Sequence, residues 1–350
     1  MRKQPVLTYT LIGINVAVFL LMLGMGVSPM APSVGQLLHW GADWGPLSLG
    51  SQPWRMLTSN YVHNGLIHIL MNMWCLFNLG RMAENVLDRW TYGLVYTACG
   101  LAGSIVSLWW HPQIIVVGAS GAIFGLAGAL IAILYLGKLP IPPEAIRKTM
   151  SSLLLFAGYN LLFGMQAGVD NSAHIGGLLA GIALGLVLAP SVTKAPELRR
   201  IWSVATLTGM AIVLLAATLF LRGQSSVDSN LKTFADAFVD ARNHKDVAKL
   251  KALVAPESLN IISSTFPREL DEYLSAYAFQ SIIPDSYSVD AKPVAADATL
   301  PLAETAIYPI RPTQRLALHF VEEPDKIATL NLNLVQENNH WLLVVPVPKK

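Results

Sequence analysis

The chain is poor in charge and in cysteine. Only 13% of its 350 residues are Asp, Glu, Lys or Arg, while 53% are hydrophobic and the mean hydropathy is +0.48. Soluble domains typically carry charge on about a quarter of their residues. The composition therefore excludes an ordinary soluble globule of this length and indicates a protein that crosses a membrane several times.

The two cysteines, Cys75 and Cys99, both lie in apolar segments, and the chain after residue 222 has none. A disulfide framework is therefore excluded there, and each cysteine is expected to be a small buried apolar group rather than a nucleophile. The formal net charge is only +2 and no block of basic residues occurs, so the sequence indicates no nucleic-acid partner. No cofactor and no metal ion is predicted.

Long apolar runs are what the chain has in abundance. A helix needs roughly 20 mainly apolar residues to cross a bilayer. The first run has an alternative reading as a signal peptide, because Arg2 and Lys3 precede its apolar core. Its length, the lack of a small-x-small cleavage site and the further runs behind it favour a membrane span. Seven segments qualify as spans: 7–27, 64–82, 91–110, 118–136, 149–167, 172–189 and 201–221.

Lys and Arg are distributed unevenly between the loops that join these spans. With the N-terminus placed inside, Arg55 is the only Lys or Arg in the outer loops between spans. Short loops rich in Lys and Arg stay in the cytoplasm, so we expect a cytoplasmic N-terminus and a C-terminal region delivered outside by the seventh span. A bacterial plasma (inner) membrane is the predicted location. The inner segments collect Arg2, Lys3, Arg81, Arg89, Lys138, Arg147, Lys148, Lys194, Arg199 and Arg200.

The composition changes after about residue 222. Apolar residues recur at helical spacing between Leu231 and Val254, as in amphipathic helices. Three later segments read as strands, and no catalytic motif occurs among them. The expected strands are 315–322, 328–336 and 341–347, with turn-like segments at 323–325 and 337–339.

The predicted fold is therefore an all-α polytopic membrane helical bundle with a small C-terminal α+β soluble domain. Six spans form the core over residues 1–195, and a seventh span follows over 196–222. The extracytoplasmic domain is expected to occupy residues 223–350.

Five polar residues lie near the starts of apolar segments. His63, His68 and Asn72 are expected in the first turns of the second span, Ser120 in the first turn of the fourth and His174 in the first turn of the sixth. Taken singly, each has a packing explanation, either an interhelical hydrogen bond or the close approach of helices rich in small residues. The topology, however, starts all three spans at the outer face. A wet cavity open to the outside explains their common depth.

This set of residues fits acyl transfer. A serine hydroxyl becomes a nucleophile when a base removes its proton, and neutral histidine is suited to that near pH 7. We therefore expect Ser120 to be the nucleophile and His174 the general base, which then protonates the leaving amine. Backbone N–H groups at the start of the fourth span, together with His68 and Asn72, are the expected oxyanion donors.

No third member of a triad is evident. Asp170 precedes His174 by four residues but lies in a loop, so a Ser-His dyad is the more economical reading. Phe124 lies one turn below Ser120, where it either supports the imidazole ring or is a plain core aromatic. Asn160, in the fifth span, is expected to make a structural hydrogen bond.

Between about residues 50 and 190 the chain resembles the rhomboid family of intramembrane serine proteases. The resemblance implies a six-span core, a Ser-His dyad, an oxyanion hole that includes His68 and Asn72, and cleavage of membrane-anchored substrates in or beside their transmembrane segments. It also implies a part for Gly118 in substrate or oxyanion-site geometry and groups His63 with that set. The motifs that carry it are Trp54-Arg55, the His63/His68/Asn72 array, Gly118-Ala119-Ser120-Gly121, and Ala173-His174 with Gly177 and Gly181.

Three functions compete at this point. The first is the protease, whose expected partners are single-span membrane protein substrates and the lipid bilayer. The second is a catalytically silent rhomboid-like protein that binds membrane clients. Such relatives lack the serine or the histidine, whereas this chain has both. The third, a transporter, is disfavoured because no span carries an acidic residue well placed to couple ions or protons.

Overall fold

The computed structural model divides the chain into two compact units, Met1–Arg222 and Gly223–Lys350. The expected turn at 323–325 and part of that at 337–339 lie outside the described residues. The described residues are 4–112, 114–164, 170–224, 229–265, 271–272, 274, 288–289, 294–295, 306–307, 314–322, 326–338, 340–345 and 347–348.

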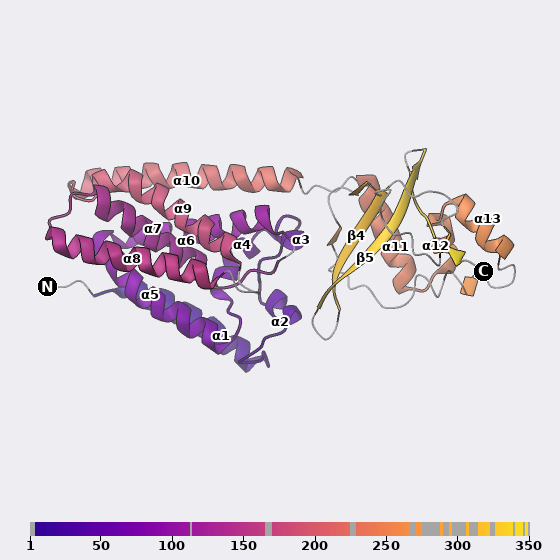
Figure 1. The fold of residues 1–350 in the computed structure, drawn as a ribbon, viewed down its shortest axis with the longest axis horizontal. Helices are drawn as coiled ribbons and strands as arrows, with labels where there is room; N and C mark the ends of the chain where they lie inside the picture. Colours follow the sequence, from indigo (N-terminus) through magenta and orange to yellow (C-terminus); the bar gives the residue numbers. More distant parts are fainter. Residues whose placement is uncertain are drawn as a thin grey trace. The chain divides into compact units, whose positions relative to one another are not determined.

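The first unit is helical, and a long helix overlaps each of the seven expected apolar segments (Figure 1). Among the described helices, α1, α6, α9 and α10 are long and apolar enough to cross a membrane, and α7 is also apolar but has 17 residues. This is the architecture of a multi-pass membrane protein. The seven helices are α1 (Val6–Gly24), α5 (Leu66–Val86), α6 (Arg89–Trp110), α7 (Ser120–Leu136), α8 (Pro143–Phe163), α9 (Asn171–Leu188) and α10 (Pro196–Gln224).

α5 begins later than the sequence predicts. Gly65 has a φ of +90°, which residues with a side chain rarely adopt, so the helix starts only at Leu66. His63, expected in the first turn of this span, therefore lies before the helix. His68 and Asn72 lie in its first two turns, as expected.

α7 and α9 pack backbone against backbone. A Cβ atom on Gly177 would collide with the backbone of Gly121, and one on Gly181 would collide with the backbone of Gly125. Both pairs step forward by four residues in the same direction along the two helices, so α7 and α9 run parallel. Their N-terminal turns therefore lie side by side.

Between α1 and α5 the chain forms short helical turns, and the buried Arg55 holds them together. Its Nη1 donates to the carbonyl oxygens of Leu38 at 2.6 Å and Ala42 at 3.1 Å, and its Nε donates to Gln52 Oε1 at 2.6 Å. The guanidinium therefore links segment 38–42 to Gln52 through three hydrogen bonds. The turns are α2 (Val34–His39), α3 (Gly45–Ser48), α4 (Arg55–Thr58) and η1 (Ser59–Tyr61).

The same loop fixes the segment that leads into α7. Asp43 and Val116 exchange two backbone hydrogen bonds, with N–O distances of 3.0 and 2.9 Å. The Gly118 N–H donates to the Ser59 carbonyl at 2.9 Å. The turn before Ser120 is thus held by main-chain bonds to a segment far upstream.

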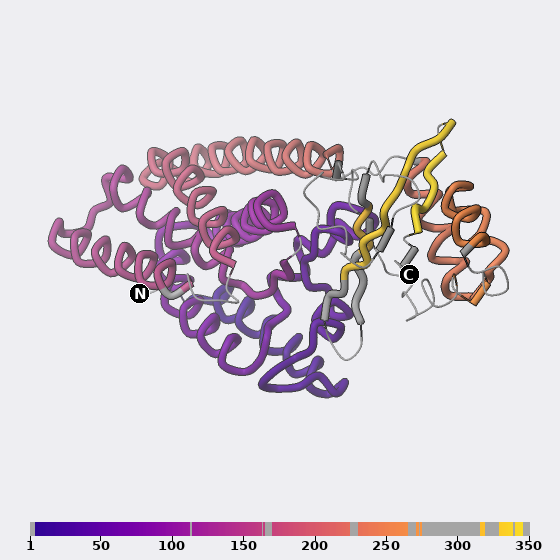
Figure 2. The backbone as a smooth tube through the Cα atoms, turned by 45° about the vertical axis from the view of Figure 1, so that its right-hand side comes forward, coloured from indigo at the N-terminus to yellow at the C-terminus, as the bar shows by residue number. Residues whose placement is uncertain are grey.

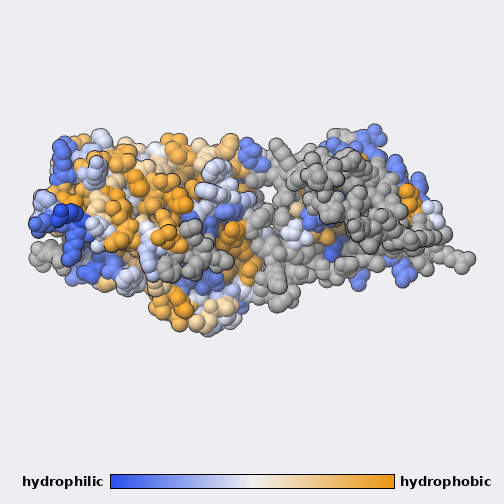
Figure 3. Space-filling model, in the orientation of Figure 1, coloured by the Kyte–Doolittle hydropathy of each residue, from blue (hydrophilic) through white to orange (hydrophobic). Residues whose placement is uncertain are grey.

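The face of the first unit that Figure 3 shows is apolar over much of its area. Large side chains on α5, α8 and α10 are exposed, with fractions of 64% for Trp74, 73% for Leu155 and 63% for Ile212. Exposed apolar area of this extent suits contact with lipid hydrocarbon rather than water.

α10 lies along one edge of the bundle in both views (Figures 1 and 2). The Nε1 of its Trp202 donates to the Val187 carbonyl, beside the end of α9, at 2.6 Å. The short turn η2 (Ala189–Ser191) follows directly after α9.

The second unit packs helices against an antiparallel sheet. Within its described residues the sheet order is β1-β4-β5-β6, with β2 also paired to β4, and β3 pairs with β7. Leu316 and Leu332 face each other across β4 and β5, and both are buried with Phe238 of α11. The helices are α11 (Ser229–Asn243), α12 (Val247–Leu253) and α13 (Pro256–Thr265), and the strands are β1 (Ser288–Val289), β2 (Val294–Ala295), β3 (Ala306–Ile307), β4 (Gln314–Glu322), β5 (Lys326–Glu337), β6 (His340–Leu343) and β7 (Val347–Pro348).

The contact between α7 and α9 can be tested by filling it. Gly181→Ala should lower the unfolding temperature of the purified full chain in detergent, because overpacking a tight contact costs typically about 1–3 kcal/mol. Gly209→Ala on α10 is the matched control, since a Cβ there meets no atom of the described part of the chain within 4 Å. That control should be neutral or slightly stabilising. An unchanged unfolding temperature for G181A would contradict the backbone contact.

Candidate active site

A cavity of about 630 Å³ lies between α5, α7, α8 and α9. Polar side chains from four helices line it. They are His68 and Asn72 from α5, Ser120 from α7, Asn160 from α8 and His174 from α9. The structure thus brings together residues that are up to about a hundred positions apart in the chain.

Ser120 and His174 are within hydrogen-bonding distance at the start of α7 and α9. Ser120 Oγ lies 2.9 Å from His174 Nε2. Ser120 is the first residue of α7, where the parallel contact with α9 sets the separation of the two helices. The pair has the geometry of a hydroxyl nucleophile and its base.

The neighbouring Asn171 determines which nitrogen of His174 is free to act as a base. Asn171 Nδ2 donates to the Leu161 carbonyl at 2.9 Å, which leaves its Oδ1 as an acceptor. That oxygen lies 3.4 Å from His174 Nδ1. A neutral imidazole then keeps its proton on Nδ1, so Nε2 accepts from the Ser120 hydroxyl.

The opposite arrangement holds for His68. Its Nδ1 accepts a hydrogen bond from the Asn64 backbone N–H at 3.1 Å. A neutral His68 therefore carries its proton on Nε2, which becomes a donor. A Cβ placed on Gly118 would lie 2.8 Å from that nitrogen and 3.8 Å from Asn72 Nδ2, and Gly118 itself has a φ of +109°. The His68 ring, the Asn72 amide and Gly118 therefore meet at one point next to Ser120.

Asn72 contributes a second donor to this point. Its Nδ2 donates to the His68 carbonyl at 2.9 Å. An amide nitrogen has two hydrogens, so one remains for another acceptor. Its Oδ1 is buried and has no hydrogen-bond partner within the described part of the chain.

His63 does not reach the cavity. It is fully buried, its Nδ1 lies 3.3 Å from the Tyr61 carbonyl, and its ring centroid lies 5.2 Å from that of His68. The side chain therefore lies behind His68.

Phe124 is expected from the sequence either to support the imidazole ring or to be a plain core aromatic, and the structure favours support of the ring. The Phe124 ring stacks on that of His174 with centroids 4.4 Å apart and an angle of 11°.

Two other polar residues have local partners. Asp170 accepts from the Ser172 N–H at 2.9 Å and from the hydroxyls of Ser107 and Ser172, so it caps the start of α9. Asn160 Nδ2 donates to the Phe156 carbonyl at 2.8 Å. Both Asp170 and Asn160 also line the cavity. The sequence drew attention to Asp170 because of its charge. The residue against the imidazole is Asn171, and its only sequence signal is its place one helical turn before His174.

The arrangement can therefore remove a proton from Ser120 and offer N–H donors beside it. These are the two requirements of acyl transfer. Across the residues the structure describes, no group of three or more His, Cys, Asp or Glu side chains is placed to hold a metal ion.

Asp43, in the loop that is hydrogen-bonded to the Val116 segment, has a fully buried carboxyl group. Burial raises the pKa of its carboxyl to about 6, against the opposing effect of the Ser48 hydroxyl, which hydrogen-bonds to it. Its Oδ2 has no hydrogen-bond partner among the described residues. The neutral carboxyl therefore suits this position better than the carboxylate does.

Comparison with known proteins gives a consistent picture. Residues 50–191 match the family model described as Rhomboid domain, a range that contains every polar residue of the cavity wall. RHOMBOID-like protein 6, mitochondrial, of Arabidopsis thaliana is 39% identical over 160 residues, 45% of this chain and 52% of that protein. Rhomboid protease GluP of Bacillus subtilis (strain 168) is 31% identical over 214 residues, 60% of this chain and 40% of that protein.

A third relative, Rhomboid protease AarA of Providencia stuartii, is 30% identical over 233 residues. The match covers 59% of this chain and 82% of that protein. By contrast, this chain spans only about half the length of plant relatives such as RHOMBOID-like proteins 6 and 7, at 52% and 50%.

The raised pKa of Asp43 predicts a pH-dependent stability. The pKa of the Asp43 carboxyl is about 6 in the folded protein, against 3.8 for the free group. The protonated carboxyl therefore stabilises the fold fully below pH 3.8, and this stabilisation is lost as the pH rises through about 6. Two pKa units correspond to roughly 3 kcal/mol. Asp43→Asn, which stays neutral, should therefore gain stability relative to wild type between pH 4.5 and 7.5. Thermal unfolding of both proteins across that range measures the difference, and parallel pH curves would contradict it.

Proposed function

Because the chain belongs to the rhomboid family, we propose that it is an intramembrane serine endopeptidase. It hydrolyses peptide bonds in or beside the transmembrane segments of membrane-anchored proteins. The observation that carries the proposal is the 2.9 Å contact between Ser120 Oγ and His174 Nε2 in the wall of a cavity within an apolar bundle. Two bacterial relatives are named rhomboid proteases.

In the first step, His174 Nε2 takes the Ser120 proton as Oγ attacks the carbonyl carbon of the scissile bond. The carbonyl oxygen becomes an oxyanion, for which His68 Nε2–H, the free N–H of Asn72 and backbone N–H groups at the start of α7 are the donors. Each such donor is typically worth about 10²–10³ in rate. Imidazolium then protonates the leaving amine, and the acyl group stays on Ser120.

In the second step, a water molecule gives its proton to His174 and attacks the acyl carbon. The carboxyl product leaves and the proton returns to Ser120. His63 takes no direct part in this scheme. It packs against His68 and helps to hold that ring in place, while Gly118 keeps the space beside the donors free of a side chain.

The membrane arrangement belongs to the same proposal. Six spans form the catalytic core over 1–195, a seventh span follows at 196–222, and residues 223–350 form an α+β domain outside. The N-terminus lies on the cytoplasmic side, because the loops rich in Lys and Arg lie there. The substrates are single-span membrane proteins. The expected membrane is a bacterial plasma membrane. The relatives themselves include bacterial proteases and a plant protein named mitochondrial.

The proposed activity predicts the behaviour of two variants. Reconstituted wild-type protein should cleave a model single-span substrate, and Ser120→Ala should abolish cleavage. His174→Ala should slow it by about 10²–10⁴, the range expected for loss of a general base. Cleavage products are measured in liposomes, and unchanged unfolding temperatures confirm that both variants are folded. Equal cleavage by all three proteins would refute the Ser-His assignment.

Absence of cleavage by all three, with the substrate still bound, would favour the second candidate, a silent client-binding protein. A serine-directed covalent probe separates the two functions without any substrate. The protease should be labelled at Ser120 in wild type only, whereas the client-binding protein should not be labelled above the level of S120A.

The position of Asn171 predicts a further result. Asn171→Leu removes the acceptor facing His174 Nδ1. By analogy with the roughly tenfold to hundredfold loss when the partner of a metal-bound imidazole is removed, kcat should fall by a similar factor while KM stays unchanged. Asn171→Asp also loses the bond to the Leu161 carbonyl but keeps an acceptor. It should therefore be faster than N171L.

A purely structural role for Asn171 would make both variants equally slow, since both break the link to α8. Gly164→Ala provides an independent route, because a Cβ there would collide with the Asn171 carboxamide. It should lower kcat without touching the imidazole directly. Full activity of N171L would contradict the orienting role, while the S120A comparison still reports on the protease itself.

A further inference from the structure

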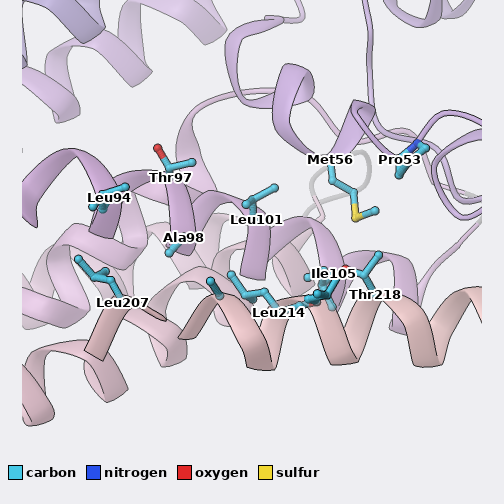
Figure 4. Close-up of a pocket in the computed structure, with 12 residues that line it drawn as sticks. Pro53, Met56, Leu94, Thr97, Ala98, Leu101, Ile105, Leu207, Leu214 and Thr218 are labelled. Atoms are coloured by element: carbon cyan, nitrogen blue, oxygen red, sulfur yellow. The ribbon is translucent and has the colours of Figure 1, made fainter. Parts of the chain in front are cut away.

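A second cavity, of about 400 Å³, lies between α6 and α10 in the first unit. Figure 4 shows the side chains of the two helices facing each other, with Leu94 and Leu207 at one end and Pro53 and Met56 at the other. None of its lining residues is shared with the cavity that holds Ser120. This groove therefore needs an explanation of its own.

The groove has the length of one membrane leaflet. Its α10 wall runs along one face of the helix from Leu207 through Ala211 and Leu214 to Thr218. At 1.5 Å per residue that stripe is about 16 Å long, and half of a typical hydrocarbon core is about 15 Å. The width is much smaller, because 400 Å³ spread over that length leaves no room for another helix of about 10–12 Å diameter.

The lining is chemically uniform. Its hydroxyls belong to Thr97 and Thr218, and each is bonded within its own helix. Thr97 Oγ1 donates to the Gly93 carbonyl at 3.0 Å, and Thr218 Oγ1 donates to the Leu214 carbonyl at 2.8 Å. Among the described residues, no charged side chain lines the groove. Its interior therefore suits a hydrocarbon chain rather than an ion or a polar substrate.

A cation stands at the end of the groove. Arg222 follows Thr218 by four residues, so it lies one turn further along the same face of α10. Its side chain is exposed, and its Nη2 donates to the Gly50 carbonyl at 3.0 Å, three residues before Pro53. A guanidinium has five N–H donors, so donors remain for an anion at this end. The adjoining segment 45–58 contains no acidic residue to neutralise it.

We propose that this groove binds one acyl chain of an anionic phospholipid, with the lipid phosphate paired to Arg222. The apolar stripe supplies the burial, and the arginine at the headgroup level supplies the charge preference. The bound chain fills the space between α6 and α10, against Met56, whose carbonyl accepts from Ser104 of α6 at 3.1 Å. The lipid is therefore a structural ligand that holds the seventh long helix to the bundle.

The test uses the purified full chain and two vesicle lipids, phosphatidylglycerol and zwitterionic phosphatidylcholine. Retained lipid is measured by native mass spectrometry, and the unfolding temperature is measured with each lipid added. Wild type should retain phosphatidylglycerol and be stabilised by it more than by phosphatidylcholine. Arg222→Gln should weaken phosphatidylglycerol binding about fivefold, the effect of about 1 kcal/mol per basic residue at a membrane surface, and should remove the preference.

Ala211→Phe places a ring in the groove and should abolish retention of both lipids. Ala216→Phe is the matched control, because Ala216 is an exposed residue of the same helix that does not line the groove. Arg200→Gln controls for charge at the other end of α10. Equal lipid retention by A211F and A216F would overturn the proposal. An unchanged phosphatidylglycerol preference in R222Q would overturn the assignment of the phosphate to Arg222.

Discussion

The parallel contact of α7 with α9 is the constraint on which the rest of the structure depends. Glycines let the two backbones meet directly at Gly121 with Gly177 and at Gly125 with Gly181. The hydroxyl and the imidazole at the ends of these helices are then 2.9 Å apart. An extra separation of about 0.6 Å would stretch that distance past the usual hydrogen-bond limit. The glycines whose sequence pattern indicated close helix packing therefore also set the distance between Ser120 Oγ and His174 Nε2.

Around this contact, hydrogen bonds set two histidines in opposite tautomers. The Leu161 carbonyl orients the Asn171 amide, whose oxygen faces His174 Nδ1 and leaves Nε2 as an acceptor. The Asn64 N–H occupies His68 Nδ1 and leaves Nε2–H as a donor. One ring is thus prepared to take a proton and the other to stabilise negative charge. Neither assignment needs an ionised group inside an apolar bundle, where charge is costly.

The sequence predicted the helical bundle, because long apolar segments indicate where the helices run. Of the five polar residues expected near helix starts, all but His63 line the cavity. The sequence could not predict that His63 lies before α5, since that depends on the φ of Gly65. Nor could it distinguish Asp170 from Asn171. The two are adjacent, and only the helix start decides that one side chain caps α9 while the other faces the imidazole. In the second unit, the helical spacing from Leu231 to Val254 concealed a break at Lys245, whose φ is +54°.

What separates the proposed catalytic groups from the other polar residues of the bundle is where their unused hydrogen-bonding capacity points. Glu84 accepts from the Leu7 N–H and from both the N–H and hydroxyl of Thr8, which fastens α1 to α5. The protein itself supplies hydrogen-bond partners for both carboxylate oxygens of Glu84, as a polar side chain buried in a helical bundle requires. His68 Nε2 and the second N–H of Asn72 instead point toward the space beside Gly118. Donors left open at one point beside a hydroxyl and its base are costly for packing alone, but they are what a developing oxyanion requires.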